Sequence, residues 1–142
     1  SCLYLDLDMI ILKNIDEFII QNQHLNILCN PISVNGKNYY NINSSMLFWN
    51  ADNKELHKIW FQYSENKIFY ETHKPSINEI YGDQKVILES NVKYKFFSTD
   101  KIRYFKFIKE EDTLDENISI IVCKGKKQKD HKSNFFVRKY WK

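Results

Sequence analysis

The sequence is poor in several residue types and patterns that define whole classes of protein. Three glycines and two prolines among 142 residues exclude collagen-like and low-complexity chains. No apolar run approaches the ~20 residues of a membrane span, so we expect no such span. The three cysteines, Cys2, Cys29 and Cys123, are odd in number and widely spaced, which excludes a disulfide framework and a zinc-binding spacing. This cysteine usage predicts a reducing compartment, and hence a cytoplasmic location.

The chain has little excess charge but ample material for a core. Its net charge of +3 is too small to indicate a nucleic-acid partner, which we therefore do not expect. The 43% of hydrophobic and 15% of aromatic residues exclude disorder and predict one domain over residues 1–142. The chain opens on the apolar run Cys2–Leu5, with no initiator methionine or signal peptide before it. We therefore expect a fragment of a longer protein.

Strand-like and helix-like patterns are mixed along the chain. We predict strands at the apolar runs Cys2–Leu5, Met9–Leu12, Leu25–Cys29, Ser45–Trp49, Val92–Phe97, Ile102–Ile108 and Ile118–Cys123. A short helical turn is predicted from Asn14 or Asp16 to Phe18. Because the first strand is fully apolar, we expect it in the middle of a sheet that is covered on both faces. The mixture, without repeats or an internal linker, predicts an α/β fold.

Two helices are predicted from capping residues and apolar periodicity. Asp52 is a suitable N-cap, and Glu55 three residues later completes a capping box. The apolar residues that follow recur at helical spacing on one face: Leu56, Ile59, Trp60 and Tyr63. A second helix is predicted from about Gly82 to Glu89.

The remaining aromatic, histidine and thiol side chains are interpreted as structural. We expect Trp49 and Trp60 in the core rather than as platforms on which a sugar stacks. His57 is expected on the polar side of the first helix. The cysteines lie in apolar strands, where a thiol usually behaves as a small, inert hydrophobic group.

An acidic pair, Asp6 and Asp8, follows the first predicted strand. On extended backbone, side chains at positions i and i+2 project from the same side. Ligands bind at the carboxyl ends of strands in α/β sheets, and two carboxylates there suit Mg²⁺ or Mn²⁺ that also contacts substrate phosphates. The sequence therefore predicts a metal site at Asp6 and Asp8. The alternative is a polar turn with two solvated aspartates.

The segment Leu3–Phe18 closely resembles the Asp-x-Asp segment of GT-A-type, glycogenin-like nucleotide-sugar glycosyltransferases. Four further segments resemble motifs of that family in the same order: Tyr40–Phe48 its Asn-Ser loop, Tyr81–Gln84 its Asp-Gln motif, Ile121–Lys126 its late strand and glycine turn, and Arg138–Trp141 its closing aromatic segment. The resemblance covers nearly the whole chain, but only the second half of such an enzyme, without the nucleotide-binding first half. It implies a partial GT-A-like mixed sheet flanked by helices.

The resemblance also implies an activity and a cofactor. The activity would be the metal-dependent transfer of a sugar from a nucleotide-sugar donor, such as a UDP-sugar, to an acceptor that the sequence does not identify. Asp6 and Asp8 would hold Mn²⁺ or Mg²⁺ against the donor diphosphate. The ion would stabilise the departing nucleoside diphosphate as a Lewis acid.

A second group of residues would bind the sugar, as the resemblance implies. Asn43, Ser44, Asp83 and Gln84 would line the donor-sugar pocket and form hydrogen bonds with its hydroxyls. Asp83 would also be the catalytic carboxylate that faces the reacting carbon. Without a ligand, Asn43–Ser45 would be an ordinary polar turn, and Asp83 would supply negative charge to a helix start.

The basic loop after the last predicted strand is a candidate phosphate site formed by Lys124, Gly125 and Lys126. A glycine turn after a buried strand can aim backbone N–H groups at a phosphate, while lysines supply positive charge. The alternative is a solvated basic loop.

Two other functions remain open. A strand that ends in Asp-x-Asp also opens phosphatases of the haloacid-dehalogenase type, in which the first Asp is a nucleophile and the second an acid/base. The other alternative is a catalytically inactive remnant, or a module that binds anions through its basic loop. Val122 in place of the family's metal-binding histidine, and Gln128 with Lys129 in place of its lysine-proline pair, favour this alternative.

The expected lack of a first half has two consequences. The nucleotide-binding strands would be missing, so we expect the chain alone to bind nucleotide sugars poorly; micromolar binding of UDP-sugars with Mn²⁺ would refute this. We also expect an exposed apolar sheet edge beside Cys2–Leu5, which favours association.

Overall fold

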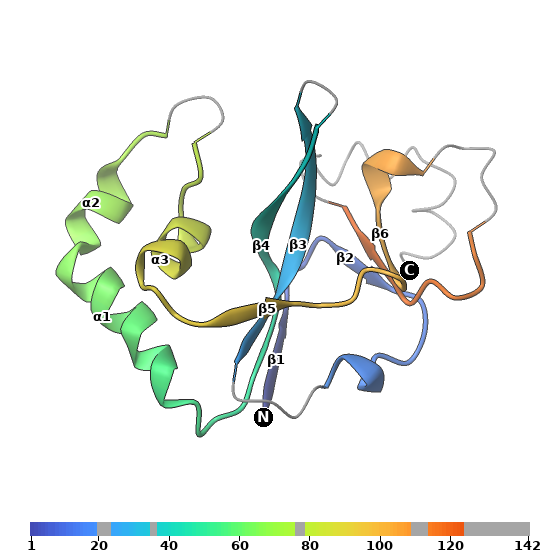
Figure 1. Ribbon diagram of the computed structural model, residues 1–142, viewed down its shortest axis with the longest axis horizontal. Helices are drawn as coiled ribbons and strands as arrows, with labels where there is room; N and C mark the ends of the chain where they lie inside the picture. The colour runs from blue at the N-terminus through green and yellow to red at the C-terminus, as the bar shows by residue number, and fades with distance from the viewer. Residues whose placement is uncertain (20–23, 35–36, 76–78, 109–113, 124–142) are drawn as a thin grey trace. The chain divides into compact units, whose positions relative to one another are not determined.

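The computed structural model describes residues 1–19, 24–34, 37–75, 79–108 and 114–123. Its strands are β1 (Cys2–Leu5), β2 (Met9–Ile11), β3 (Leu25–Val34), β4 (Lys37–Trp49), β5 (Tyr94–Phe96), β6 (Ile102–Tyr104) and β7 (Ile120–Val122). Its α-helices are α1 (His57–Glu65), α2 (Lys67–Thr72) and α3 (Asp83–Glu89). Short 3₁₀ turns are η1 (Asp16–Phe18), η2 (Lys54–Leu56) and η3 (Phe105–Phe107). The predicted α/β fold is confirmed (Figure 1).

The chain divides into two compact units. The first unit contains residues Ser1–Tyr4 and Ile20–Phe97, and the second contains Leu5–Ile19 and Ser98–Lys142. Each unit has a mixed sheet and a cluster of buried apolar side chains, so the two are described in turn. The prediction of a single domain over residues 1–142 stays a prediction.

The first unit is built on a four-stranded sheet in the order β1-β4-β3-β5. Strands β3 and β4 pair antiparallel, and β5 pairs parallel with β3. Residues of β3 and β4 face a core that α3 and the segment before β5 complete. The buried members of this core are Leu25, Ile27, Ile42, Ile87 and Val92. The β-branched side chains of Ile27 and Ile42 favour the extended backbone of β3 and β4.

The pairing of β3 with β4 is interrupted at one point. Ile27 lies opposite Leu47, but the next residue, Leu28, lies opposite Asn43. Three residues of β4 therefore have no counterpart on β3 and form an irregularity like an extended bulge. Such irregularities bend a strand and change the direction of its side chains.

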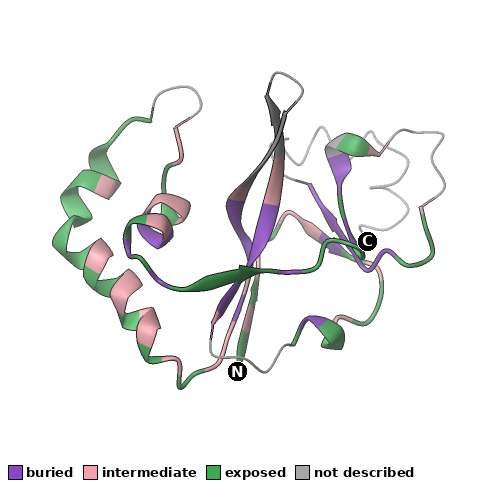
Figure 2. Cartoon of the chain, viewed as in Figure 1, coloured by how far each residue is buried: buried purple, intermediate pink, exposed green. Residues whose placement is uncertain are grey.

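The helices of the first unit follow β4. Asn53 caps η2, because its side-chain oxygen accepts a hydrogen bond from the N–H of Glu55 at 3.0 Å. The prediction that Asp52 is the cap is therefore wrong by one residue. Helices α1 and α2 contain no buried residue and are drawn in green and pink in Figure 2, whereas α3 buries Val86 and Ile87.

The second unit has a three-stranded sheet in the order β2-β7-β6. Strand β7 pairs antiparallel with β2 and parallel with β6. Its buried cluster comprises Ile10, Phe105, Ile118, Ile121 and Cys123. Beside it, Glu17 on η1 accepts hydrogen bonds from the Lys101 ammonium and the Ser119 hydroxyl, and so connects η1 to the segments around β6 and β7.

Most predicted elements are present, and the exceptions have physical causes. Among the described strands, β1 lies at a sheet edge next to β4, not in the middle, since the partners of a strand depend on residues remote in the sequence. Cys2 and Tyr4 are exposed there, as expected for an apolar edge. The strand predicted at Ile102–Ile108 ends at Tyr104 and continues as η3, and α2 was not predicted. In the part of the chain that the structure describes, no helix is long and apolar enough to cross a membrane.

Candidate functional site

Asp6 and Asp8 lie on the turn that joins β1 to β2. Strand β1 ends at Leu5, and the N–H of Met9 donates a hydrogen bond to the carbonyl of Asp6 at 3.3 Å. The two aspartates therefore follow the strand directly, as predicted. They are carried by a reverse turn rather than by the extended backbone that we expected, because the chain passes here from one sheet to the other.

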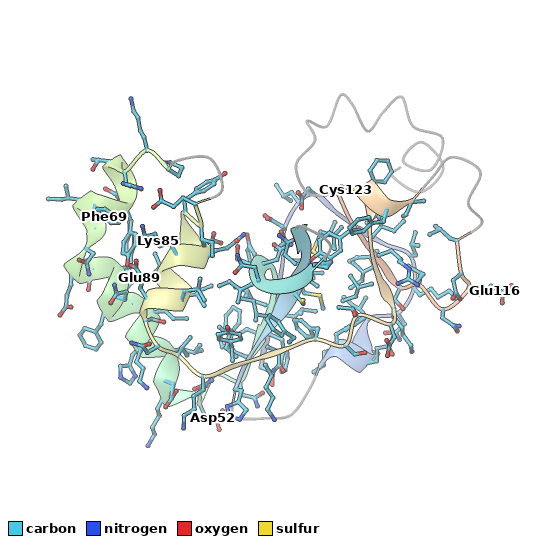
Figure 3. The ribbon with its side chains drawn as sticks, turned by 45° about the horizontal axis from the view of Figure 1, so that its top comes forward. Asp52, Phe69, Lys85, Glu89, Glu116 and Cys123 are labelled. Atoms are coloured by element: carbon cyan, nitrogen blue, oxygen red, sulfur yellow. The ribbon has the colours of Figure 1, made fainter. Side chains whose placement is uncertain are left out.

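The two carboxylates have different surroundings. Asp6 is exposed, whereas Asp8 is half-buried and its Oδ1 atom is withdrawn from solvent. The backbone of Asp8 is held by β7, since its carbonyl accepts a hydrogen bond from the N–H of Cys123 at 2.9 Å (Cys123 is labelled in Figure 3). The turn therefore holds one shielded and one solvated carboxylate.

The surroundings of Cys123 shift the pKa of its thiol. Burial, followed by the negative charge of Asp8, raises the pKa of Cys123 from 9.0 to about 11. A thiol with so high a pKa stays protonated at neutral pH, and only the thiolate is a strong metal ligand or nucleophile. Cys123 is therefore a protonated thiol in the buried cluster of the second unit.

The donor set at this turn suits a hard divalent cation. Mg²⁺ is commonly held by one or two carboxylates together with water and substrate phosphates, and Mn²⁺ accepts the same oxygen ligands. Among the described residues, no group of three or more His, Cys, Asp or Glu side chains is placed to hold a metal. Asp6 and Asp8 therefore fit an ion that takes its other ligands from water and a phosphate-bearing substrate.

Asn43 is the last paired residue of β4 before the irregularity and Ser44 is the first residue within it; both are buried, with exposed fractions of 0% and 5%. The side-chain oxygen of Asn43 accepts a hydrogen bond from the N–H of Ser45 at 3.0 Å. This bond satisfies a donor that regular pairing would have satisfied, and so it stabilises the irregular backbone. A contact of Asn43 or Ser44 with a sugar stays a prediction.

Asp83 and Gln84 begin α3, directly after Gly82. The Asp83 carboxylate is exposed, and its Oδ1 accepts the N–H of Gln84 at 2.9 Å. Gly82 has φ 63° and ψ −144°, a conformation that residues with a Cβ rarely adopt. The glycine thus sets the direction in which the chain enters the helix and presents Asp83.

Asp83 opens onto a cavity of about 610 Å³ within the first unit. Its aliphatic wall comes from both the sheet and the helices: Leu25, Leu47, Leu56, Ile59, Val86 and Ile87. Among the described residues, Asp83 is the one predicted site residue that lines it. Asp6 and Asp8 belong to the second unit.

Aromatic side chains form the rest of the cavity wall. Trp49, Trp60, Tyr63 and Tyr70 all line it, together with the carboxylate of Glu71. Trp60 is 66% exposed, so the prediction that it lies in the core is wrong, whereas Trp49 is half-buried and packs against the core. Trp60 is exposed because no described element covers that side of α1.

Sequence reasoning missed Tyr70 and Glu71 because α2 was not predicted. The tyrosines Tyr63 and Tyr70 are seven residues apart, which is two helical turns, so extending the apolar stripe past Tyr63 would have found the second one. His57 is exposed, as predicted. The candidate phosphate residues Lys124, Gly125 and Lys126 lie outside the described residues.

Comparison with protein-family models, with curated proteins and with solved structures finds no match for this chain.

Proposed function

We propose that this chain takes part in the metal-dependent transfer of a sugar from a nucleotide-sugar donor. The observation that carries the proposal is the acidic turn, where Asp6 and Asp8 directly follow a strand and offer two carboxylates of unequal exposure. The order of sequence motifs supports it, since the acidic turn, the Asn-Ser segment and the Asp-Gln motif follow one another as in GT-A-type glycosyltransferases.

Asp6 and Asp8 are the residues that would hold Mn²⁺ or Mg²⁺. When bound, the ion supplies Lewis-acid stabilisation of the diphosphate leaving group. The turn limits the movement of both carboxylates, because its backbone is held by the Asp6–Met9 and Asp8–Cys123 hydrogen bonds. Preorganised ligands lose little entropy when the ion binds, which favours a well-defined site.

Asp83 is the residue that would act on the sugar. Its carboxylate is solvent-exposed at the mouth of a cavity and is anchored through one oxygen to the backbone of Gln84. A charged carboxylate can accept hydrogen bonds from sugar hydroxyls or stabilise positive charge that develops at the reacting carbon. Gln84 follows it and would contribute an amide with both donor and acceptor groups.

The first experiment tests metal binding at the acidic turn. Mn²⁺ is titrated into the isotope-labelled chain, and amide NMR signals are followed. Because a paramagnetic ion broadens nearby resonances, the signals of Asp6, Leu7, Asp8 and Met9 are expected to broaden first. Asp6→Asn and Asp8→Asn should remove this effect, whereas Asp52→Asn, which changes an exposed aspartate of the first unit, should not.

The second experiment tests turnover by the natural protein in its full length. Release of UDP from UDP-sugars in the presence of Mn²⁺ should fall by more than ~100-fold in the Asp6→Asn variant, because each 1.4 kcal/mol of lost stabilisation is a factor of ten. Asp83→Asn should lower turnover while leaving the Mn²⁺ broadening unchanged. If Mn²⁺ broadens no signal of the turn with or without UDP, the proposal is wrong and an inactive remnant is the better interpretation.

A further inference from the structure

The cavity of the first unit has the size and composition of a small-molecule site. Its volume of about 610 Å³ lies within the range of pockets that enclose drug-sized ligands, roughly 300–1,000 Å³. Its walls are aliphatic and aromatic, and its two charged side chains are the carboxylates of Glu71 and Asp83. The part of an occupant that lies against these walls must therefore be largely apolar, because hydroxyl groups buried there would find few partners.

The charge at the cavity has one sign. Among the described residues that line it, none is a lysine, arginine or histidine. Two lysines lie near the cavity residues: Lys67 lies 3.9 Å from Glu71 in an exposed ion pair, and Lys85 donates to Glu79 at 2.8 Å. The exposed pair of Lys67 with Glu71 contributes little to stability, so a bound cation can take the place of the lysine beside Glu71.

The ammonium of Lys85 also lies 4.8 Å from the ring centroid of Phe69; both residues are labelled in Figure 3.

The aromatic side chains form a connected row beside these carboxylates. The ring centroids of Trp60 and Tyr63 are 6.1 Å apart, and those of Tyr63 and Tyr70 are 6.4 Å apart with an interplanar angle of 14°. The Tyr63 hydroxyl donates to Glu71 at 2.8 Å, and the Tyr70 hydroxyl donates to Glu89 on α3. Each tyrosine hydroxyl therefore holds a carboxylate at the edge of its ring, and aromatic rings and negative charge both attract a cation.

We propose that this cavity binds an organic cation with an apolar body, such as a quaternary ammonium group attached to an alkyl or aromatic chain. The apolar body fills the aliphatic part of the cavity between the sheet and α3. The cationic group lies against the aromatic row, within reach of Glu71. This inference goes beyond sugar transfer and does not involve Asp6 or Asp8.

The experiment compares three probes that share an apolar body and differ in their polar group: phenylpropyltrimethylammonium, phenylbutanol and phenylbutanoate. Each is titrated into the full chain, and binding is measured by calorimetry and by the fluorescence of Trp49 and Trp60. The cation is expected to bind about tenfold more tightly than either of the other probes. Raising the salt concentration should reduce this preference, because salt screens exposed charges.

Three variants locate the binding site. Glu71→Gln should weaken binding of the cation by about fivefold, because it removes the charge at constant shape. The affinity for phenylbutanol should change by less than about twofold. Trp60→Ala should weaken binding of the cation by about tenfold. Because Trp60 is exposed, its removal leaves the fold intact. Glu65→Gln is the matched control, because Glu65 is exposed on α1 and is not part of the cavity wall.

The proposal is overturned by any of three results. Equal affinity for the three probes would mean that the cavity selects hydrocarbon alone. Equal effects of Glu71→Gln and Glu65→Gln on binding would show that the Glu71 carboxylate is not part of the binding site. Failure of all three probes to bind at millimolar concentration would show that the cavity accepts no small amphiphile.

Discussion

At the scale of single residues, burial gives identical side chains different chemistry. Cys2 lies in the apolar strand β1, as predicted, but it is exposed there. Cys29 and Cys123 are buried, and burial raises the pKa of both thiols. For Cys123 the negative charge of Asp8 acts in the same direction, because a second negative charge nearby is unfavourable.

This shift predicts a loss of stability at alkaline pH. The Cys123 pKa is 9.0 in the unfolded chain and about 11 in the folded one, so the unfolded state releases its proton first as the pH rises. The protonated thiol therefore contributes fully below pH 9, and about 2 to 3 kcal/mol is lost as the pH approaches 11. The free energy of unfolding in urea, measured between pH 8 and pH 11, checks this.

Cys123→Ala is the comparison for that series. It should lower stability at pH 8 through lost packing, yet show a smaller alkaline decline than the natural chain. Part of the alkaline loss of stability should remain in both proteins, because the pKa values of three other groups are also raised: Cys29, Tyr63 and Tyr70. Parallel curves for the two proteins would contradict the assignment to Cys123.

At the scale of elements, helix starts depend on single side chains. Asn53, not Asp52, forms the capping hydrogen bond of η2, which leads into α1. Asn53→Ala should therefore lower the free energy of unfolding by about 1 kcal/mol, a typical loss for a helix cap. Asp52→Ala should change it by less than about 0.5 kcal/mol, as for other exposed positions. Equal effects of the two substitutions in urea unfolding would contradict this.

Gly82 controls the start of α3 through its backbone. A Cβ added there would meet no atom within 4 Å, so the effect of Gly82→Ala comes from the positive φ of 63° alone. We expect a loss of about 1 to 3 kcal/mol in thermal or urea unfolding. Tyr81→Ala, at the exposed neighbour, is the control and should have a small effect. A neutral Gly82→Ala would mean that the chain relaxes into another conformation at this point.

At the scale of the whole molecule, each unit has its own buried cluster. Ile27 belongs to the cluster of the first unit and Ile121 to that of the second, and both have an exposed fraction of 0%. Ile27→Ala and Ile121→Ala should each lower stability by about 2 to 5 kcal/mol. Ile68→Ala, at a position that is 79% exposed, should have little effect.

Hydrogen exchange measures which segments lose stability in each of these variants. Protection should fall first in β3 and β4 for Ile27→Ala, and first in β2 and β7 for Ile121→Ala, because local opening follows the cluster that has lost a side chain. A uniform loss of protection over both units would instead mean that they unfold as one.

Local patterns in the sequence predicted much of this structure for clear reasons. Runs of β-branched and other apolar residues located the strands, because such side chains favour extended backbone. The acidic pair after β1 and the Asp-Gln motif at the start of α3 were visible without any structure. Strand ends were less reliable: β3 and β4 are longer than predicted, since the pairing of one strand extends the other.

The sequence by itself determined the fold class, the position of most elements, and the acidic turn, since each depends on neighbouring residues. The tertiary structure alone decided that β1 lies at an edge, that β4 is irregular between Asn43 and Leu47, and that Trp60 faces a cavity. These features depend on which remote segments pack together. The helical spacing of a tryptophan in the sequence does not show whether it is exposed or buried, because burial depends on which remote segments pack against it in the folded protein.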